Sequence, residues 1–247
     1  MAQDTVHFDH IAFGVASIAS TTPFLVGALG GAAMAGGPSA EFRAYQWRFA
    51  GGGVIEVLEP HGEASGFMHR FLAARGPGIH HVTFKVPSLD AACDRARAAG
   101  YGIVGYDDSD PSWKEAFLHP KQAQGIVVQF AESDPGASGE WSSQAPPPSP
   151  PRATETAAVL GLRLRAKSEA AARRQWAQVA GGVETRAGGL LVYTWSGSFL
   201  RIAVEVDASA PPGPIAVELG GVEPGVVPEG AHPVLGGRFL VVAPARS

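Results

Sequence analysis

The feature that most restricts the fold of this chain is an internal repeat in its first half. Residues 8–15 (FDHIAFGV) are echoed by residues 79–86 (IHHVTFKV), and residues 53–59 (GVIEVLE) are echoed by residues 125–132 (GIVVQFAE). In the first pair, apolar side chains alternate with others at the period of a half-buried strand. Similarity at a fixed period indicates that one structural unit has been duplicated.

Each copy of the repeat reads as a strand, a helix and three further strands. Helical patterns follow the first strand over roughly residues 17–29 and 88–99, and Gly100 stops the second of them. Gly-rich and Asp-Ser-Asp-Pro turns separate the later strand-like segments. We therefore predict an α+β fold in which two βαβββ modules, residues 5–62 and 76–133, form one curved, mostly antiparallel sheet.

Strand parity sorts the side chains of the repeat onto two faces. Alternate residues of a strand point to opposite faces, so the apolar residues cover the helix and the residues between them point away. Corresponding positions of the face away from the helix hold His10 and His81 in the first strands, and Glu56 and Gln129 in the last strands. His80 has the opposite parity, and we expect it on the helix side with a structural role.

The repeat also resembles a known superfamily over residues 8–132. Residues 10–13 (HIAF), 55–60 (IEVLEP), 78–82 (GIHHV), 117–121 (FLHPK) and 125–129 (GIVVQ) are similar to methylmalonyl-CoA epimerase and glyoxalase I. These belong to the vicinal oxygen chelate superfamily, which includes the glyoxalases, bleomycin resistance proteins and extradiol dioxygenases. The resemblance implies a divalent metal ion bound by His10, Glu56, His81 and Gln129.

The chemistry of these side chains agrees with a metal site. Neutral imidazoles and a carboxylate suit Zn, Ni, Co, Mn or Fe, and two open positions accommodate water or two oxygens of a substrate. The amide oxygen of Gln129 is a weaker ligand. The alternative is that His10 and His81 are ordinary hydrogen-bonded strand histidines and that Glu56 points into a wet cavity.

Two glutamines argue against simple transfer of the epimerase activity. Abstraction of a proton alpha to a thioester needs a positioned base and a stabilised enolate oxygen. Gln129 and Gln46 occupy positions where the epimerases are expected to have acids, and an amide cannot accept a proton at neutral pH. Glu56 is the carboxylate that remains, and we predict it as the catalytic base, with a metal-bound water as the alternative base. Gln46, Arg48, Trp113, Lys114 and Lys121 are predicted to contact the substrate, with a solvated turn or a packed Trp as the alternative.

Three functional classes follow from this reading. The first is a metal-dependent isomerase or lyase of the glyoxalase and epimerase type, acting on a small oxygenated metabolite or an acyl thioester. The second is a non-catalytic protein that binds or sequesters a small molecule, as the bleomycin resistance proteins do. The third is an extradiol-type dioxygenase, which requires an acid on the final strand, where Gln129 stands.

Composition divides the chain after the repeat. In residues 134–152 Pro, Ser and Gly displace the apolar pattern, as in a semi-extended linker. The linker separates a domain of residues 1–133 from a domain of residues 153–247. Strand-like segments at 159–164, 190–195 and 199–204 and a helix from Ser168 repeat the βαβββ order, and 215–219 and 238–243 fit the ends of a truncated fourth copy. In the third copy, the first strand (residues 159–164) has no histidine and Arg201 lies near the place of Glu56. We therefore expect a degenerate domain without metal ligands.

Charge and composition restrict the partners. A net charge of −4 without basic runs gives no footprint for nucleic acid, and no stretch is long and apolar enough for a membrane span. Cys93 is the only cysteine, so the chain cannot form an internal disulfide. We expect a cytoplasmic protein with a small-molecule substrate, which is a homodimer unless the C-terminal domain replaces the second chain.

Overall fold

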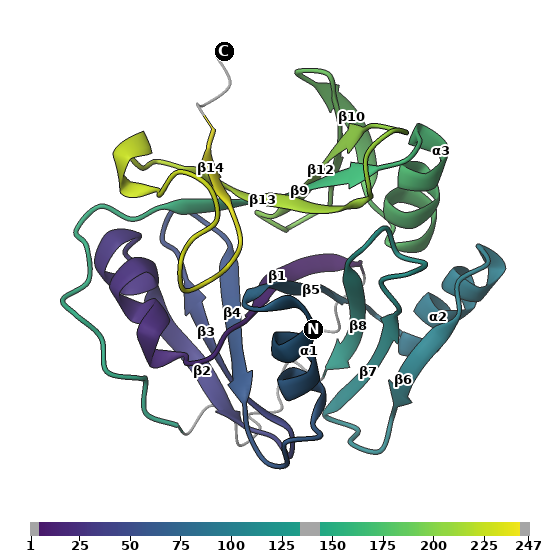
Figure 1. Cartoon of the computed structure of the whole chain (residues 1–247). Coiled ribbons are helices and arrows are strands. Elements are labelled where there is room, and N and C mark those ends of the chain that lie inside the picture. The colour runs from purple at the N-terminus through teal and green to yellow at the C-terminus, as the bar shows by residue number, and fades with distance from the viewer. Residues whose placement is uncertain (1–4, 134–143, 243–247) are drawn as a thin grey trace. The chain divides into compact units, whose positions relative to one another are not determined.

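The computed structural model describes residues 5–133 and 144–242. The strands of its first sheet are β1 (His7–Gly14), β2 (Ala32–Pro38), β3 (Phe42–Arg48), β4 (Val54–Pro60), β5 (Gly78–Lys85), β6 (Ile103–Asp107), β7 (Trp113–Leu118) and β8 (Val127–Ser133). They are hydrogen-bonded in the order β2-β3-β4-β1-β5-β8-β7-β6 (Figure 1). The order 2-3-4-1 is thus followed by its reversed equivalent 5-8-7-6, as expected for two copies of one module.

The strand directions repeat as well. In each copy the first strand runs parallel to the last, so that Ala12 lies opposite Glu56 and Thr83 lies opposite Gln129. The remaining pairs within each copy are antiparallel. The predicted α+β fold with tandem βαβββ modules is confirmed, and the register places Glu56 and Gln129 at equivalent positions.

The helices of the two modules differ in regularity. Helix α2 (Leu89–Ala98) begins where the Ser88 hydroxyl accepts a hydrogen bond from Ala91 N at 3.2 Å, and buries Leu89, Ala92, Cys93 and Ala96. The helix predicted over residues 17–29 is instead a 3-10 turn, η1 (Ala19–Thr21), followed by a π-helix, η2 (Pro23–Ala28). The two segments meet at Pro23, which has no N–H to donate to the preceding turn.

A second sheet repeats the arrangement in the C-terminal part. Its strands are β9 (Ala158–Ala166), β10 (Val183–Ala187), β11 (Leu190–Thr194), β12 (Arg201–Val206), β13 (Gly213–Gly220) and β14 (Phe239–Val241), in the order β10-β11-β12-β9-β13-β14. Strand β12 is parallel to β9, and β14 is parallel to β13. This is the strand order of a third module, followed by the first and last strands of a fourth.

The helix of the third module has two parts, α3 (Glu169–Ala172) and the π-helix η4 (Arg173–Val179). Aligning residues 159–166 with 8–15 places Gly161 where His10 stands in β1. Ala203, opposite Arg163, then takes the place of Glu56 opposite Ala12. Arg201, predicted at that place from sequence, lies two residues earlier on β12.

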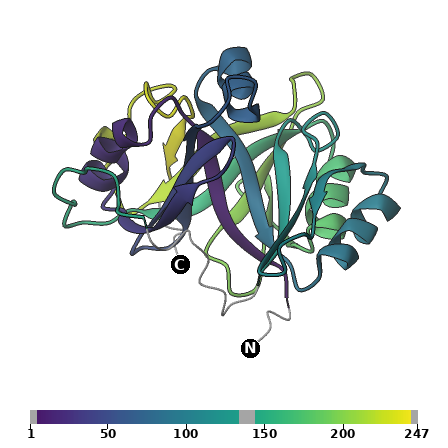
Figure 2. The ribbon, with the colours of Figure 1, turned by 90° about the horizontal axis from the view of Figure 1, so that it is seen from below.

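The described residues form two compact units. Unit 1 contains residues 5–10, 81–133 and 161–215, and unit 2 contains residues 11–80, 144–160 and 216–242. In unit 1 the ring centroid of Phe84 lies 4.8 Å from that of Trp195, and Figures 1 and 2 show α2 and η4 side by side. In unit 2 the rings of Phe13 and Phe239 stack at 5.7 Å.

Each unit therefore combines residues from both sides of the predicted linker. The domain boundaries at residues 134–152 stay a prediction, and residues 134–143 lie outside the described part of the chain. Within the linker, residues 144–152 contain neither helix nor strand.

Candidate metal centre

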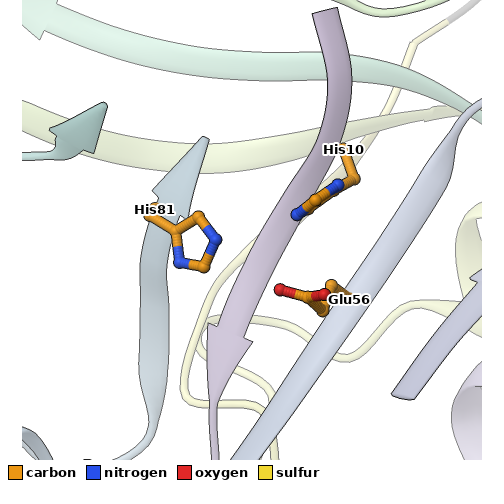
Figure 3. A group of neighbouring side chains, drawn as sticks. All are labelled: His10, Glu56 and His81. Atoms are coloured by element: carbon orange, nitrogen blue, oxygen red, sulfur yellow. The ribbon is translucent and has the colours of Figure 1, made fainter. Parts of the chain in front are cut away.

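Three of the four predicted ligands converge. The side chains of His10, Glu56 and His81 point toward one another (Figure 3), and one potential ligand atom from each lies within 4.8 Å of the other two. They come from β1, β4 and β5, and their exposed fractions are only 2%, 5% and 5%. Ligand atoms of a tetrahedral Zn site, at about 2.0–2.1 Å from the ion, lie about 3.3–3.4 Å apart, so the three side chains would have to draw closer together to bind such an ion.

The strand register explains this convergence. Glu56 lies opposite Ala12, and His10 is two residues before Ala12 on the same strand. Because residues two apart share a face, His10 and Glu56 point to the same side of the sheet. The rings of His10 and His81 are 5.7 Å apart on that side. We call this side of the eight-stranded sheet the site face.

The fourth predicted ligand, Gln129, lies next to His10 through a single side chain. The Thr83 hydroxyl donates a hydrogen bond to Gln129 Oε1 at 2.6 Å. The hydroxyl oxygen of Thr83 is also 2.9 Å from His10 Nε2. Thr83 and Gln129 are both buried. The amide is therefore on the site face and beside the histidine, as the repeat predicts.

Two neighbours hold His10 and Glu56 in place. Asp9 Oδ2 lies 2.7 Å from His10 Nδ1, which directs Nε2 toward the cluster. Burial raises the pKa of Asp9, but its hydrogen bond and charge attraction to His10 outweigh this, and the pKa is below its usual value. Gln46, opposite Glu56 in β3, donates from Nε2 to Glu56 Oε1 at 3.0 Å.

The two modules differ on the site face. In the first module Ala12, Ala44 and Leu58 are buried beneath Met68 of helix α1 (Phe67–Arg75), with Phe42, Phe67, Phe71 and Leu72 packed around them. In the second module Thr83 and Glu115 take the positions of Ala12 and Ala44, and Ala131 takes that of Leu58. Farther along the same face the second module carries a cation and an aromatic ring. Lys85 Nζ donates to Ser133 Oγ at 2.7 Å and lies 3.8 Å from the centre of the Trp113 ring.

Helix α1 also explains the position of His80. Its ring lies 4.7 Å from that of Phe71 and 5.7 Å from that of Phe67, because the chain enters β5 directly after α1. Parity predicts that His80 lies on the sheet face that is covered by the helix of its own module. The observed neighbours belong instead to α1, which packs on the site face of the first module. Burial lowers the pKa of His80 to about 4, in keeping with a neutral, structural histidine.

The predicted substrate contacts fall into two groups. Gln46 and Trp113 lie on the site face, and Arg48 shares the strand face of Gln46 at the exposed end of β3. Lys114 does not lie on the site face, because neighbouring residues of β7 point to opposite faces and Trp113 lies on the site face. Its Nζ pairs with Glu132 at 2.7 Å, and Glu132 accepts from Leu89 N at the start of α2. Lys121 is exposed in the turn before β8.

One polar residue of the site face escaped the sequence interpretation. Glu115 Oε2 accepts hydrogen bonds from Gln129 Nε2 at 2.7 Å and from Trp113 Nε1 at 2.9 Å. In β7, residues 113, 115 and 117 alternate with the buried Ala116 and Leu118. This period-2 pattern would have predicted that Glu115 lies on the site face.

Comparison with known proteins agrees with this arrangement. Residues 9–117 match the sequence model of the Glyoxalase/Bleomycin resistance protein/Dioxygenase superfamily. The match covers less than half of the chain. Among curated proteins, an ethylmalonyl-CoA/methylmalonyl-CoA epimerase of Cereibacter sphaeroides is 34% identical over 84 residues, which are 32% of this chain and 60% of the relative. The match thus spans less than two thirds of the relative's length.

Solved structures of the superfamily resemble the chain in different parts. A methylmalonyl-CoA epimerase from Mycobacterium tuberculosis has 26% identity and a TM-score of 0.48, over 55% of this chain and 93% of its own. A mutant 4-hydroxymandelate synthase from Streptomyces coelicolor has 13% identity and a TM-score of 0.57, over 88% of this chain and 71% of its own. The latter likeness shows the fold alone. In the described residues, no helix is long and apolar enough to span a membrane.

Proposed function

We propose that this protein is a metal-dependent isomerase or lyase of the glyoxalase and epimerase type. The observation that carries the proposal is the buried cluster of His10, Glu56 and His81, whose ligand atoms lie within 4.8 Å of one another. Burying two imidazoles and a carboxylate in one place is costly unless they are paired or bind an ion. The superfamily of residues 9–117 supports the same conclusion.

The donor set favours a divalent ion of Zn, Ni, Co, Mn or Fe. In the proposed site His10 would bind through Nε2, since Asp9 lies against Nδ1; Nε2 would then lose its proton and exchange its contact with Thr83 Oγ1 for the ion. Gln46 orients the carboxylate of Glu56. Gln129 is the proposed fourth ligand through its amide oxygen. The bound ion would act as a Lewis acid for two vicinal oxygens of a substrate and would stabilise an enolate.

An acyl thioester or a small oxygenated metabolite fits this chemistry. The relative from Cereibacter sphaeroides is named for ethylmalonyl-CoA and methylmalonyl-CoA, which supports the thioester class. Gln46 and Gln129 cannot take the proton removed alpha to the carbonyl, so we assign the role of base to Glu56.

The site face also suggests where a substrate lies. Helix α1 covers the strands of the first module, with Met68 completely buried there. The second module instead presents Trp113, which is 37% exposed, beside Lys85. We propose that atoms of the substrate beyond its metal-bound oxygens extend over β7 and β8, where a cation and an aromatic ring are available for an anionic or planar group.

Metal analysis of the protein purified without added metal tests the proposal. We expect about one divalent ion per chain, and loss of that ion in His10→Ala and in His81→Ala. His119→Ala, which removes an exposed histidine of a turn, is the matched control and should keep the ion. A protein that binds none of the five metals, even when they are added, would contradict the proposal.

A non-catalytic sequestering protein is the second candidate, and the two amides favour it. Gln46 and Gln129 stand near the metal ligands where a catalyst would profit from acids. Incubation of the metal-loaded protein with methylmalonyl-CoA in deuterated water separates the two functions. Incorporation of deuterium at the alpha carbon supports the isomerase, whereas tight binding without exchange supports sequestration.

Two further features stay predictions of the sequence. These are a location in the cytoplasm and assembly into a homodimer. Sedimentation of the purified protein at several concentrations would determine whether one or two chains form the particle.

A further inference from the structure

Glu115 is connected to the candidate metal centre by a continuous chain of hydrogen bonds within unit 1. Its Oε2 accepts from Gln129 Nε2 at 2.7 Å, Gln129 Oε1 accepts from the Thr83 hydroxyl at 2.6 Å, and Thr83 Oγ1 is 2.9 Å from His10 Nε2. Strand β7 carries Glu115 two residues before Phe117, which lies opposite Gln129. Glu115 therefore shares the site face, one step farther from the histidine.

The chemistry of Glu115 fixes which end of the Gln129 amide faces the histidine. The oxygen and nitrogen of a carboxamide have nearly the same shape, so hydrogen-bond partners decide its orientation. An ionised carboxylate only accepts hydrogen bonds, which requires the NH₂ end of Gln129 at Glu115. The oxygen end must then face Thr83, in agreement with the observed hydrogen bonds, and Thr83 is the residue that contacts His10.

Orientation matters here because only one end of an amide can bind a cation. The oxygen has two lone pairs, so it can accept from Thr83 and still serve as a ligand. The NH₂ group has no available lone pair, and its hydrogens would repel an ion. Rotation of the amide by a half turn would thus convert a ligand into an obstacle.

Glu115 is itself held in place. Trp113 Nε1 donates to the same Oε2 at 2.9 Å, and the Trp113 ring is covered by Lys85 Nζ at 3.8 Å. Lys85 in turn donates to Ser133 Oγ at 2.7 Å. The carboxylate consequently receives two hydrogen bonds on one oxygen, from partners that are anchored on β5 and β8.

We propose that Glu115 is a positioning residue, which locks the Gln129 amide with its oxygen toward the metal centre and so makes Gln129 a competent fourth ligand. This inference rests on the proposed metal-dependent function. It assigns a task to a side chain that does not itself contact the ion. Partners of this kind typically change metal affinity 10- to 100-fold.

The test is a double-mutant cycle of Co²⁺ affinity, measured by calorimetric titration of the metal-free full chain. Glu115→Leu removes the acceptor and should weaken Co²⁺ binding about 10- to 100-fold. In the Gln129→Glu background, both ligand oxygens are equivalent and no orienting partner is needed. There Glu115→Leu should leave affinity unchanged or raise it, because it also removes a like charge beside the new carboxylate.

Glu115→Leu is expected to weaken Co²⁺ binding when residue 129 is glutamine but not when it is glutamate. This difference distinguishes loss of the amide orientation from a general loss of structure. Asp108→Leu, in the exposed turn before β7, is the control for loss of one negative charge near the site and should bind Co²⁺ as the natural protein does. Equal weakening by Glu115→Leu in both backgrounds would overturn the inference, as would unchanged affinity in the Gln129 background. Failure of the natural protein itself to bind any of Zn, Ni, Co, Mn and Fe would instead refute the proposed function.

Discussion

Replacing Glu56 by glutamine should separate metal binding from folding. In the metal-free protein Gln46 Nε2 donates to Glu56 Oε1 at 3.0 Å, and the carboxylate is 5% exposed. A glutamine at the same place can turn its oxygen toward Gln46 and keep that bond. We therefore expect Glu56→Gln to change the unfolding free energy of the metal-free protein by less than about 1 kcal/mol.

The same substitution should have a large effect once metal is added. It removes the single anionic ligand of the proposed set, so the loss of affinity should exceed the 10- to 100-fold range of indirect partners. A factor of about 100 corresponds to about 2.8 kcal/mol. At a free ion concentration of about 100 times the natural Kd, the metal then stabilises the variant by about 0.4 instead of about 2.7 kcal/mol. At roughly 2–4 °C per kcal/mol for a chain of this size, the metal-induced increase in Tm should be about 5–9 °C smaller in the variant.

Thermal unfolding with and without Zn²⁺ measures both quantities in one experiment. The natural protein at a free ion concentration of about 100 times Kd should gain about 2.7 kcal/mol. His119→Ala provides the matched control, since His119 is exposed and outside the cluster. If Glu56→Gln showed the same metal-induced shift as the natural protein, Glu56 would not be a ligand and the isomerase proposal would lose its base.

Three further predictions concern the surroundings of the site. Met68→Ala should lower the unfolding free energy by about 2–5 kcal/mol in urea titrations, because Met68 is completely buried between α1 and the site face; a loss below 1 kcal/mol would contradict that packing. Burial lowers the pKa of His232, and its Nδ1 accepts from the backbone of Val234 and Leu235, so unfolding free energy should be fully retained above about pH 6.5 and fall as pH decreases below it. His232→Asn should flatten that decrease, and equal slopes would refute the assignment. Burial raises the pKa of the Cys93 thiol, so Ellman's reagent at pH 8 should label Cys93 only after unfolding; rapid labelling of the native protein would contradict its burial.

The internal repeat and the alternation of side chains along each strand predicted that His10, Glu56 and His81 converge. Both features depend only on local geometry. His10, Glu56 and His81 lie on one face since alternate residues of a strand do so in any register. The match between the two copies then selected which strands adjoin. Parity likewise places Lys114 away from the site, where it pairs with Glu132, and a parity test of residues 113–118 would have corrected that prediction.

The position of α1 and the type of helix after β1 depend on tertiary packing, which the sequence pattern does not indicate. Nothing in the sequence pattern of helix α1 indicates that it covers the site face of the first module. The type of helix after β1 was also missed, because the interruption at Pro23 is accommodated by a 3-10 turn and a π-helix. Loop paths and helix type are decided by tertiary contacts more than by propensity.

The two modules solve the same orientation problem with opposite partners. In the first, the carboxylate of Glu56, a proposed ligand, is held by the amide of Gln46 on the adjacent strand. In the second, the amide of Gln129 is held by the carboxylate of Glu115 on the adjacent strand. Each pair joins an acceptor-only group to a group that must donate, so the geometry of each pair is determined without an ion. The two pairs are not at equivalent positions, because Gln46 lies directly opposite Glu56, whereas Glu115 is two residues before Phe117, which lies opposite Gln129. Each module thus orients its polar residue by a different strand position, and an amide at residue 129 is oriented as firmly as the carboxylate at residue 56.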